Sequence, residues 1–235
     1  MSNLWVKGEA KEYMPGVHYW ENSIEVPDGI IEHMNKEVDD WKVNITQDMA
    51  ENNEIYKQGI FHNGPIRFNP EFNFKTEESI TYFKQTVLNT MDKVAQYCEL
   101  YPDAKLEINW MEPWQYITYI PPKNMTYHSD NHSVRNQQTG MHDLGPYLRR
   151  FTVLTYLNDD YKGGALKYRY FDLPPFKPKA GTVLIQPSNY MWSHATTPLL
   201  NGRKAAFLVA VSSHYDVSSE EYGAKPEDII RRELR

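Results

Sequence analysis

Apolar residues recur with helical spacing in two segments of the N-terminal half. The first segment follows the start signal Pro27-Asp28, and its shared face carries Ile31, Met34, Val38 and Trp41. The second follows Thr76, has Glu77 and Glu78 in its first turn, and carries on one face Ile80, Phe83, Val87, Met91, Val94 and Cys98. Apolar residues three and four positions apart behind such start signals are typical of amphipathic helices. The sequence therefore predicts two helices, each with one face packed on a core.

The stretch between these helices, from Asn52 to Pro70, is polar and rich in turn-forming residues. It contains Gly59, Gly64, Pro65 and Pro70. Long segments of this composition commonly form loops that cover a functional site. We therefore expect a loop or hairpin that acts as a lid.

After about Leu106 the pattern changes to short runs rich in β-branched and aromatic residues, separated by turn residues. These runs span Leu106 to Trp110, Gln115 to Ile120, Arg150 to Leu157, Ala165 to Phe171, Thr182 to Ile185, Met191 to Thr196, and Lys204 to Ser212. Many short strands without intervening helices predict a jelly-roll or cupin-like barrel. The expected fold class is thus α+β with a mainly β core and N-terminal supporting helices.

Length and composition limit the alternatives. With 235 residues the chain fits one domain, 1–235, in which 1–103 holds the helices and lid loop, 104–215 the β core and 216–235 a charged tail. The net charge of −6 gives no general attraction to nucleic acid or anionic lipid, so neither is an expected partner. A single cysteine, Cys98, and a polar N-terminus favour a cytoplasmic location, and no apolar run reaches membrane-spanning length. The oligomeric state cannot be read from these features.

One group of residues has the composition of a metal site. His128 and Asp130 form a His-x-Asp motif, and His194 lies far downstream. In an extended segment residues two apart point to the same side, so both motif side chains can enter a barrel and meet His194 from a facing strand. The other His-x-Asp pair, His214 and Asp216, has no later histidine to complete it. Two histidines and one carboxylate suit non-haem iron with open coordination positions, and zinc is the competing metal.

The C-terminal part resembles the prolyl 4-hydroxylase-like branch of the 2-oxoglutarate oxygenases. The matching motifs occur in order and are Tyr119-Ile-Pro-Pro, Tyr127-His128-Ser-Asp130-Asn131, Arg149-Arg-Phe-Thr152-Val-Leu-Thr-Tyr156-Leu-Asn158, Gly163-Gly164-Ala-Leu, Lys179-Ala-Gly181-Thr-Val-Leu-Ile-Gln-Pro187-Ser, and His194-Ala-Thr-Thr-Pro198 followed by Gly202-Arg203. The first hundred residues carry none of the motifs. The resemblance implies a double-stranded β-helix and an oxidative decarboxylation of 2-oxoglutarate to succinate and CO2 that hydroxylates a substrate C–H bond.

The same resemblance assigns roles to individual residues. His128, Asp130 and His194 would hold Fe(II) as the catalytic centre, with O2 and 2-oxoglutarate as cosubstrates and ascorbate as a candidate further cofactor. The cosubstrate's distal carboxylate would pair with a basic residue and a tyrosine, for which Arg203 and Tyr156 are the first candidates, because a guanidinium binds a carboxylate through two parallel bonds. Lys204 is the weaker basic candidate. The remaining cosubstrate-binding candidates are Thr152 and Tyr119.

The substrate is less determined than the cosubstrate. Arg149 matches a position on the peptide-binding side of prolyl hydroxylases, which favours a peptide or protein substrate with proline as the target. One departure counts against proline: those enzymes commonly have a tryptophan six residues after the basic residue, and six residues after Arg203 is Val209. A hydroxylase of a free amino acid or small metabolite is the alternative. A metal-binding β-barrel sensor without turnover is the alternative of another class.

Overall fold

The computed structural model describes residues 8–52, 65–108, 110–132, 134–135, 142–143 and 148–213. The middle of the expected lid loop, 53–64, and the expected charged tail, 216–235, lie outside the described residues. None of the described helices combines the length and apolar character that a membrane crossing requires.

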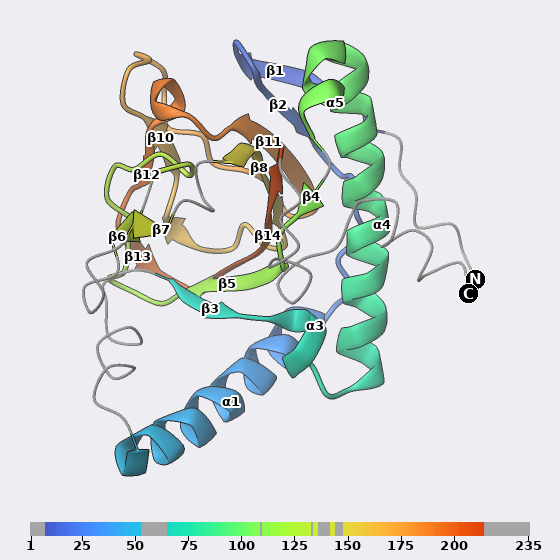
Figure 1. Cartoon of the computed structure of the whole chain (residues 1–235). Coiled ribbons are helices and arrows are strands. Elements are labelled where there is room, and N and C mark those ends of the chain that lie inside the picture. The colour runs from blue at the N-terminus through green and yellow to red at the C-terminus, as the bar shows by residue number, and fades with distance from the viewer. Residues whose placement is uncertain are drawn as a thin grey trace.

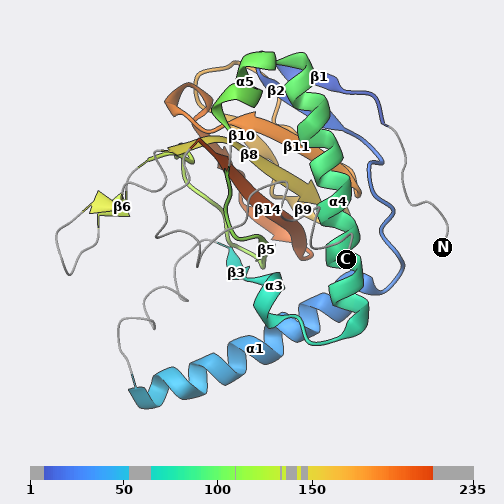
Figure 2. The ribbon, with the colours of Figure 1, turned by 45° about the vertical axis from the view of Figure 1, so that its right-hand side comes forward.

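Both expected helices are present. Helix α1 covers Ile30–Asn52 and helix α4 covers Glu77–Leu100. Thr76 caps α4 as expected, since its hydroxyl accepts a hydrogen bond from the backbone N–H of Ser79 at 3.4 Å. Figure 2 shows α4 lying across the strands of a large sheet, whereas α1 leaves the body of the protein at one end. Helix α1 extends well beyond the predicted stripe, because residues 42–52 contain no glycine or proline that would end it.

One antiparallel sheet of eight strands forms most of the barrel (Figure 1). Its strand order is β1-β2-β11-β8-β14-β5-β3, and β4 pairs with the far part of β14. The strands are β1 (Lys11–Met14), β2 (Val17–Trp20), β3 (Ile66–Phe68), β4 (Trp110–Met111), β5 (Gln115–Tyr119), β8 (Arg149–Tyr156), β11 (Thr182–Pro187) and β14 (Lys204–Ser212). The long strands β8 and β14 lie at its centre and pair from Arg149 and Ser212 to Tyr156 and Ala206.

Smaller sheets close the other side of the barrel. Strands β10 and β12 pair with each other, and single β-bridges extend this sheet at both edges, joining Leu166 to Phe176 and His128 to His194. Two further pairs are β9 with β13 and β6 with β7. Their bounds are β6 (Val134–Arg135), β7 (His142–Asp143), β9 (Lys162–Gly163), β10 (Leu166–Tyr168), β12 (His194–Thr196) and β13 (Leu199–Asn201). This is the mixed α+β architecture with an antiparallel core that the sequence predicts.

Several segments differ from the expectation. The expected first strand, Leu106 to Trp110, is instead the end of helix α5 (Pro102–Glu107) followed by β4, because Pro102 is favourable at the first position of a helix. The end of the expected lid forms β3 and the short helix α3 (Pro70–Asn73). Strands β1 and β2 were not expected, and the expected strand from Met191 begins with the 3-10 turn Tyr190–Trp192.

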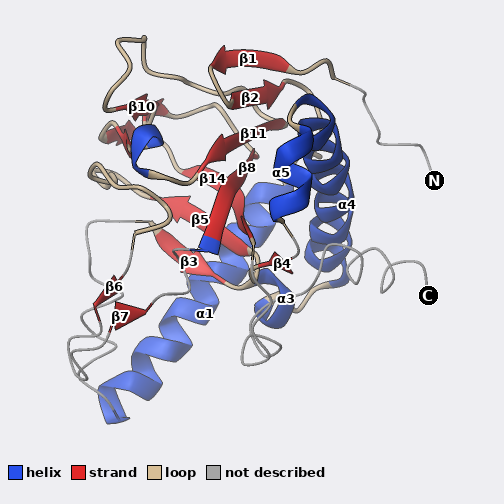
Figure 3. Cartoon of the chain, turned by 45° about the horizontal axis from the view of Figure 1, so that its top comes forward, coloured by secondary structure: helices blue, strands red, loops and turns tan. Residues whose placement is uncertain are grey.

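Side-chain alternation on the large sheet separates two cores. On β14 the side chains of Ala205, Phe207, Val209 and Val211 join the core beneath the helices, which Figure 3 shows covering one side of the strands. The intervening positions 204, 206, 208 and 210 face the interior of the barrel. Strand β8 behaves alike: the hydroxyl of Thr155 bonds that of Thr90 on α4 at 2.9 Å, and Thr152, Leu154 and Tyr156 line the barrel interior.

Candidate metal centre

His128, Asp130 and His194 meet at one end of the barrel interior. Each offers one ligand atom, and these three atoms lie within 4.8 Å of one another. His128 Nε2 is 3.4 Å from Asp130 Oδ1, and His194 Nε2 is 3.8 Å from Asp130 Oδ2. The two histidine segments are joined by reciprocal backbone hydrogen bonds of 3.0 and 2.9 Å. The facing-strand arrangement expected from the sequence is therefore present.

Backbone contacts fix both imidazole rings. Nδ1 of His128 is 2.8 Å from the carbonyl oxygen of Thr126, and Nδ1 of His194 is 3.0 Å from that of Trp192. A ring nitrogen beside a carbonyl oxygen carries the proton and donates it, which leaves the Nε2 lone pair for a metal. Both Nε2 atoms belong to the close contacts with Asp130. The rings are thus oriented for metal binding before any ion arrives.

Asp130 is held by Gln186, a residue that the sequence did not single out. The Gln186 amide nitrogen is 3.3 Å from Asp130 Oδ2 and 3.3 Å from His194 Nε2, so it contacts two candidate ligand atoms. The amide oxygen of Gln186 accepts a hydrogen bond of 2.6 Å from the hydroxyl of Tyr168. The available signal was a glutamine near the end of strand β11, in which Thr182 is the one other polar residue. Such contacts commonly orient ligands and tune metal affinity.

The protonation states suit a divalent cation. Burial opposes ionisation of Asp130, but the neighbouring His194 and His128 outweigh it and hold the pKa of this carboxyl well below its usual range. Burial lowers the pKa of the His194 imidazole and favours its neutral form, whereas at His128 the contact with Asp130 outweighs burial and raises the pKa, so a metal ion would displace a proton there. A carboxylate and a neutral imidazole are the forms that bind metal. Two imidazole nitrogens and one carboxylate therefore fit Fe(II) by both chemistry and placement.

The three residues border a cavity of about 740 Å³ inside the barrel. Every other predicted site residue except Arg203 also lines it, namely Tyr119, Arg149, Thr152 and Tyr156. Thr152 and Tyr156 reach it because they share the inward face of β8. The structure thus brings together side chains from β5, β8, β12 and β14 that are far apart in the sequence.

Arg203 lies elsewhere, so the structure does not support its expected role. Its guanidinium bonds both carboxylate oxygens of Asp39 on α1, at 2.7 and 3.1 Å, and the hydroxyl of Thr118 at 2.9 Å. Arg203 lies directly before β14. Alternation along the strand places it on the same side as Ala205 and Phe207, which face the helices. Arg203 therefore connects α1 to the sheet.

The adjacent Lys204 occupies the position expected for Arg203. Its side chain is in the cavity wall and the residue is only 3 % exposed. Nζ lies 5.4, 5.1 and 5.7 Å from the ring centres of Tyr119, Tyr156 and Tyr161. Within the described part of the chain no carboxylate forms an ion pair with it, and burial lowers the pKa of the Lys204 ammonium to about 7. This buried cation is placed to receive an anion.

The glycine pair Gly163-Gly164 helps to position this lysine. Lys204 Nζ donates a hydrogen bond of 2.6 Å to the carbonyl oxygen of Gly164. Both glycines have positive φ, 77° and 63°, and a Cβ on Gly163 would be 2.0 Å from the carbonyl oxygen of Pro198. The pair is thus a turn, as expected, and the carbonyl oxygen of Gly164 holds the Lys204 ammonium.

Near the candidate metal ligands, Arg149 is paired rather than open to solvent. Its guanidinium donates two hydrogen bonds of 2.6 and 2.5 Å to the carboxylate of Glu112, which also lines the cavity. A third bond of 3.0 Å reaches the backbone carbonyl oxygen of Asp130. Arg149 therefore connects the cavity wall to the segment that carries the metal-binding carboxylate. Glu112 was not singled out in the sequence, because one acidic residue between short strands has no distinguishing pattern.

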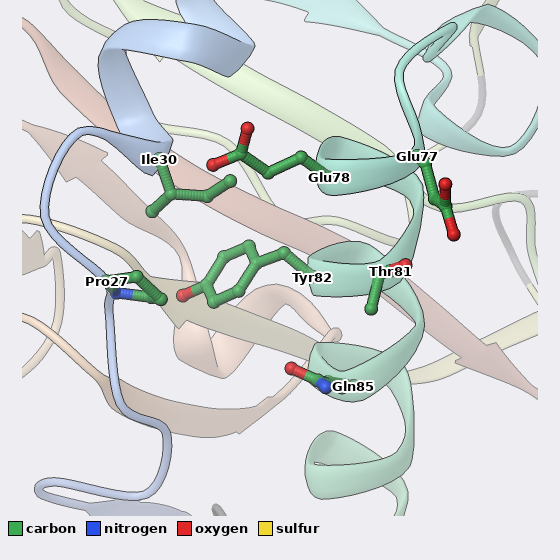
Figure 4. Close-up of a pocket in the computed structure, with 7 residues that line it drawn as sticks. All are labelled: Pro27, Ile30, Glu77, Glu78, Thr81, Tyr82 and Gln85. Atoms are coloured by element: carbon green, nitrogen blue, oxygen red, sulfur yellow. The ribbon is translucent and has the colours of Figure 1, made fainter. Parts of the chain in front are cut away.

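A second, shallower hollow lies on the helical side of the protein (Figure 4). It is lined by Pro27, Ile30, Glu77, Glu78, Thr81, Tyr82 and Gln85. In Figure 4 Ile30, Glu78 and Tyr82 point toward one another, whereas Glu77 points away. None of these residues borders the barrel cavity, so the hollow is separate from the metal centre.

Comparison with known sequences agrees with this site. Residues 114–211 match the sequence profile of the 2OG-Fe(II) oxygenase superfamily. That span contains the three candidate ligands, the cavity-lining tyrosines and Lys204. No curated protein matches the chain in sequence.

Comparison with solved structures concerns the fold. A prolyl hydroxylase from Trichoplax adhaerens, solved with a hypoxia-inducible factor peptide fragment, is 16 % identical with a TM-score of 0.52, and the match covers 84 % of each chain. A viral collagen prolyl hydroxylase from Paramecium Bursaria Chlorella virus-1, solved with 2OG, is 18 % identical with a TM-score of 0.46 over 84 % of this chain and 96 % of that one. A Pseudomonas putida prolyl-4-hydroxylase is 14 % identical with a TM-score of 0.48, over 85 % and 94 % of the two chains.

Proposed function

Because the chain belongs to the 2OG-Fe(II) oxygenase superfamily, we propose that this enzyme hydroxylates a C–H bond of a peptide or protein, with proline as the leading target. Succinate and CO2 would be the coproducts. The observation that carries the proposal is the shared cavity, which has a three-ligand metal group and, in its wall, the buried ammonium of Lys204, which forms no ion pair among the described residues. We set aside the alternative of a metal-binding β-barrel sensor without turnover, because the matched superfamily consists of enzymes.

In this proposal His128, Asp130 and His194 hold Fe(II). The iron with 2-oxoglutarate supplies oxygen activation by oxidative decarboxylation of the cosubstrate. The chain orients the two imidazoles through Thr126 and Trp192 and the carboxylate through Gln186. These contacts keep the donor atoms together, so little reorganisation is required when the ion binds.

The distal carboxylate of 2-oxoglutarate pairs with Lys204 in this proposal. A buried ammonium without a counter-ion is costly, and a bound carboxylate removes that cost while the surrounding tyrosine rings exclude water. Tyr156, Tyr119 and Thr152 line the same cavity and complete the pocket. Burial raises the pKa of the Tyr156 hydroxyl far above its usual value, so the group stays protonated and can donate a hydrogen bond to the carboxylate.

A peptide remains the leading substrate class. The cavity lining includes the charged side chains of Arg67, Glu112 and Arg149, and the N–H and C=O groups of a peptide backbone can form hydrogen bonds with such side chains. The Trichoplax enzyme was solved with a peptide, which makes peptides the first compounds to test. With Lys204 as the basic residue, the position six residues later is Ala210, which lines the cavity. The tryptophan common in prolyl hydroxylases is absent there too, and this leaves the choice of target residue to experiment.

The substrate class is tested by incubating the iron-loaded enzyme with 2-oxoglutarate and either proline-rich peptides or free amino acids. We expect succinate formation to rise with peptides, and mass spectrometry to find one added oxygen on a peptide proline. Oxygen on free proline but on no peptide would transfer the assignment to the metabolite alternative, for which Arg67 at the cavity would be the first candidate to hold the substrate carboxylate. Oxygen on lysine or asparagine of a peptide would keep the class and reject proline.

The buried lysine makes cosubstrate binding dependent on pH. In the free enzyme the pKa of Lys204 is about 7, because burial disfavours the charged form, and a bound carboxylate would raise that pKa. The charged form binds, so affinity is highest below the free-enzyme pKa and falls as pH rises through it, by up to about tenfold per pH unit. Titrations of 2-oxoglutarate between about pH 6.5 and 9 measure this fall. Lys204→Arg is the control, since a guanidinium stays charged and should flatten the profile; an unchanged slope in that variant would contradict the assignment.

A further inference from the structure

Two cations and two tyrosines form a compact group on the outside of the barrel. Lys167 Nζ lies 5.0 Å from the ring centre of Tyr127, and the Arg169 guanidinium carbon lies 5.6 and 5.8 Å from the rings of Tyr127 and Tyr170. Tyr127 is 40 % exposed and Tyr170 is 57 % exposed. We call these four residues the tyrosine–cation patch. Cations over tyrosine faces are held in place without losing access to solvent.

The tyrosine–cation patch is attached to both segments that carry the metal-binding histidines. Tyr127 lies between Thr126 and His128, which both line the cavity. The backbone N–H of Arg169 donates a 2.8 Å hydrogen bond to the carbonyl oxygen of Ser193, the neighbour of His194. Tyr168 pairs with His194 in the β10–β12 ladder and is buried, so the alternation of β10 turns Lys167 to the other face, and the exposed Arg169 follows directly after the strand.

The tyrosine–cation patch lies next to the cavity and away from the helices. Figures 1 and 3 show β10 on the side of the barrel opposite α4. Tyr127 is one residue from two cavity-lining positions, and an extended peptide advances roughly 3.3 Å per residue. A peptide with its target residue in the cavity therefore reaches the patch within a few residues.

The charge of the patch is opposite to that of the whole chain. The chain carries a formal net charge of −6. Nevertheless, among the described residues no carboxylate forms an ion pair with Lys167 or Arg169. Two fixed cations that form no ion pair among the described residues complement an anionic ligand, and a guanidinium fork binds a carboxylate through parallel hydrogen bonds. An acidic peptide segment suits this patch better than a nucleic acid, which the overall negative charge would repel.

We propose that the tyrosine–cation patch binds an acidic segment of the peptide substrate, a few residues from the residue that enters the cavity. This inference rests on the proposed peptide hydroxylase function. It makes the patch a determinant of which peptides are selected, separate from the iron and cosubstrate residues. Lys167 and Arg169 would contact acidic side chains, while Tyr127 and Tyr170 would offer flat surfaces and hydroxyl groups to the peptide.

The test uses fluorescently labelled peptides with one central proline and a flanking block of glutamates, serines or lysines, placed before or after the proline. Binding is measured by anisotropy without oxygen, in the presence of Fe(II) and 2-oxoglutarate. Of the two glutamate peptides, with the block before or after the proline, we expect one to bind about tenfold more tightly than the serine peptide with the same block position. Added salt should reduce this ratio of affinities. Equal affinity for all three blocks would overturn the proposal.

The double variant Lys167→Glu/Arg169→Glu should reverse the order, so that the lysine peptide binds more tightly than the glutamate peptide. General damage to the fold would weaken the binding of both peptides and would not reverse the order of their affinities. The matched control is Lys36→Glu/Lys75→Glu, which changes the net charge equally at two exposed positions on the helical side and should keep the original order. An unchanged order in the patch variant would contradict the proposal.

Two further results separate this inference from the proposed function. If the glutamate peptide is preferred and the patch variant reverses the order, but mass spectrometry finds oxygen on none of the peptides, the patch is supported and the substrate assignment fails. If peptides gain oxygen but the block has no effect on binding or turnover, the function stands and the patch fails. A single-stranded oligonucleotide that displaces the glutamate peptide at a comparable concentration would overturn the choice of an acidic peptide.

Discussion

Replacing His128, Asp130 or His194 by alanine is expected to abolish the weak visible band that an iron–2-oxoglutarate chelate gives in the absence of oxygen. Each variant removes one of the three candidate ligand atoms, which lie within 4.8 Å of one another. Two remaining protein ligands cannot hold the ion in the arrangement that leaves neighbouring positions open for the cosubstrate. Loss of a residue that only supports a metal ligand lowers metal affinity or activity by about 10- to 100-fold. Loss of a ligand itself should cost more, so we expect succinate formation to fall by more than about a hundredfold.

His132 provides a matched control for this experiment. It also lines the cavity, and its ring centre is 6.3 Å from that of His128, but it is not part of the three-residue group. His132→Ala should therefore keep the band. If the triad variants retain the band and His132→Ala loses it, the metal centre has been assigned to the wrong residues.

The second large effect is expected at Lys204. Lys204→Met removes the charge while keeping most of the side-chain volume, so the distal carboxylate of 2-oxoglutarate would lose its partner inside a buried pocket. Loss of one partner of a buried, hydrogen-bonded charge pair costs about 2 to 5 kcal/mol, which raises the apparent 2-oxoglutarate constant by more than about tenfold. Kinetic titration of 2-oxoglutarate measures this change. Tyr156→Phe, which keeps the ring and removes the hydroxyl, should give a smaller rise.

Arg203→Ala is the informative comparison, because the sequence alone favoured this residue. Its ion pair with Asp39 is partly exposed, so its loss should cost at most about 1 kcal/mol of the free energy of unfolding. The apparent 2-oxoglutarate constant should change by less than about twofold. A large rise in Arg203→Ala together with no change in Lys204→Met would restore the original assignment and remove the central observation behind the proposed pocket.

The sequence predicted those elements whose signals are local. The start of α4 at Thr76 follows from a capping residue and two acidic residues, and the interaction is made by atoms only three residues apart. Most strands from β5 onward were predicted from short β-rich runs between turn residues. By contrast, strands β1, β2 and β3 carry weaker local patterns. Strand β2 pairs with β11 and β3 pairs with β5, which are distant in sequence, and β1 joins the sheet through β2.

By itself, the sequence predicted the resemblance to the 2OG-Fe(II) oxygenases, which residues 114–211 match, the mainly β core and the group His128, Asp130 and His194, because their signals are short motifs and strand periodicity. The basic residue of the cavity was decided only by the tertiary structure. Arg203 and Lys204 are adjacent, and a shift of one position along a strand exchanges the two faces of the sheet, so only the pairing of β14 with β5 and β8 turns Lys204 inward. Likewise, Gln186, Glu112 and the tyrosine–cation patch become recognisable only where the folded chain brings separate segments together.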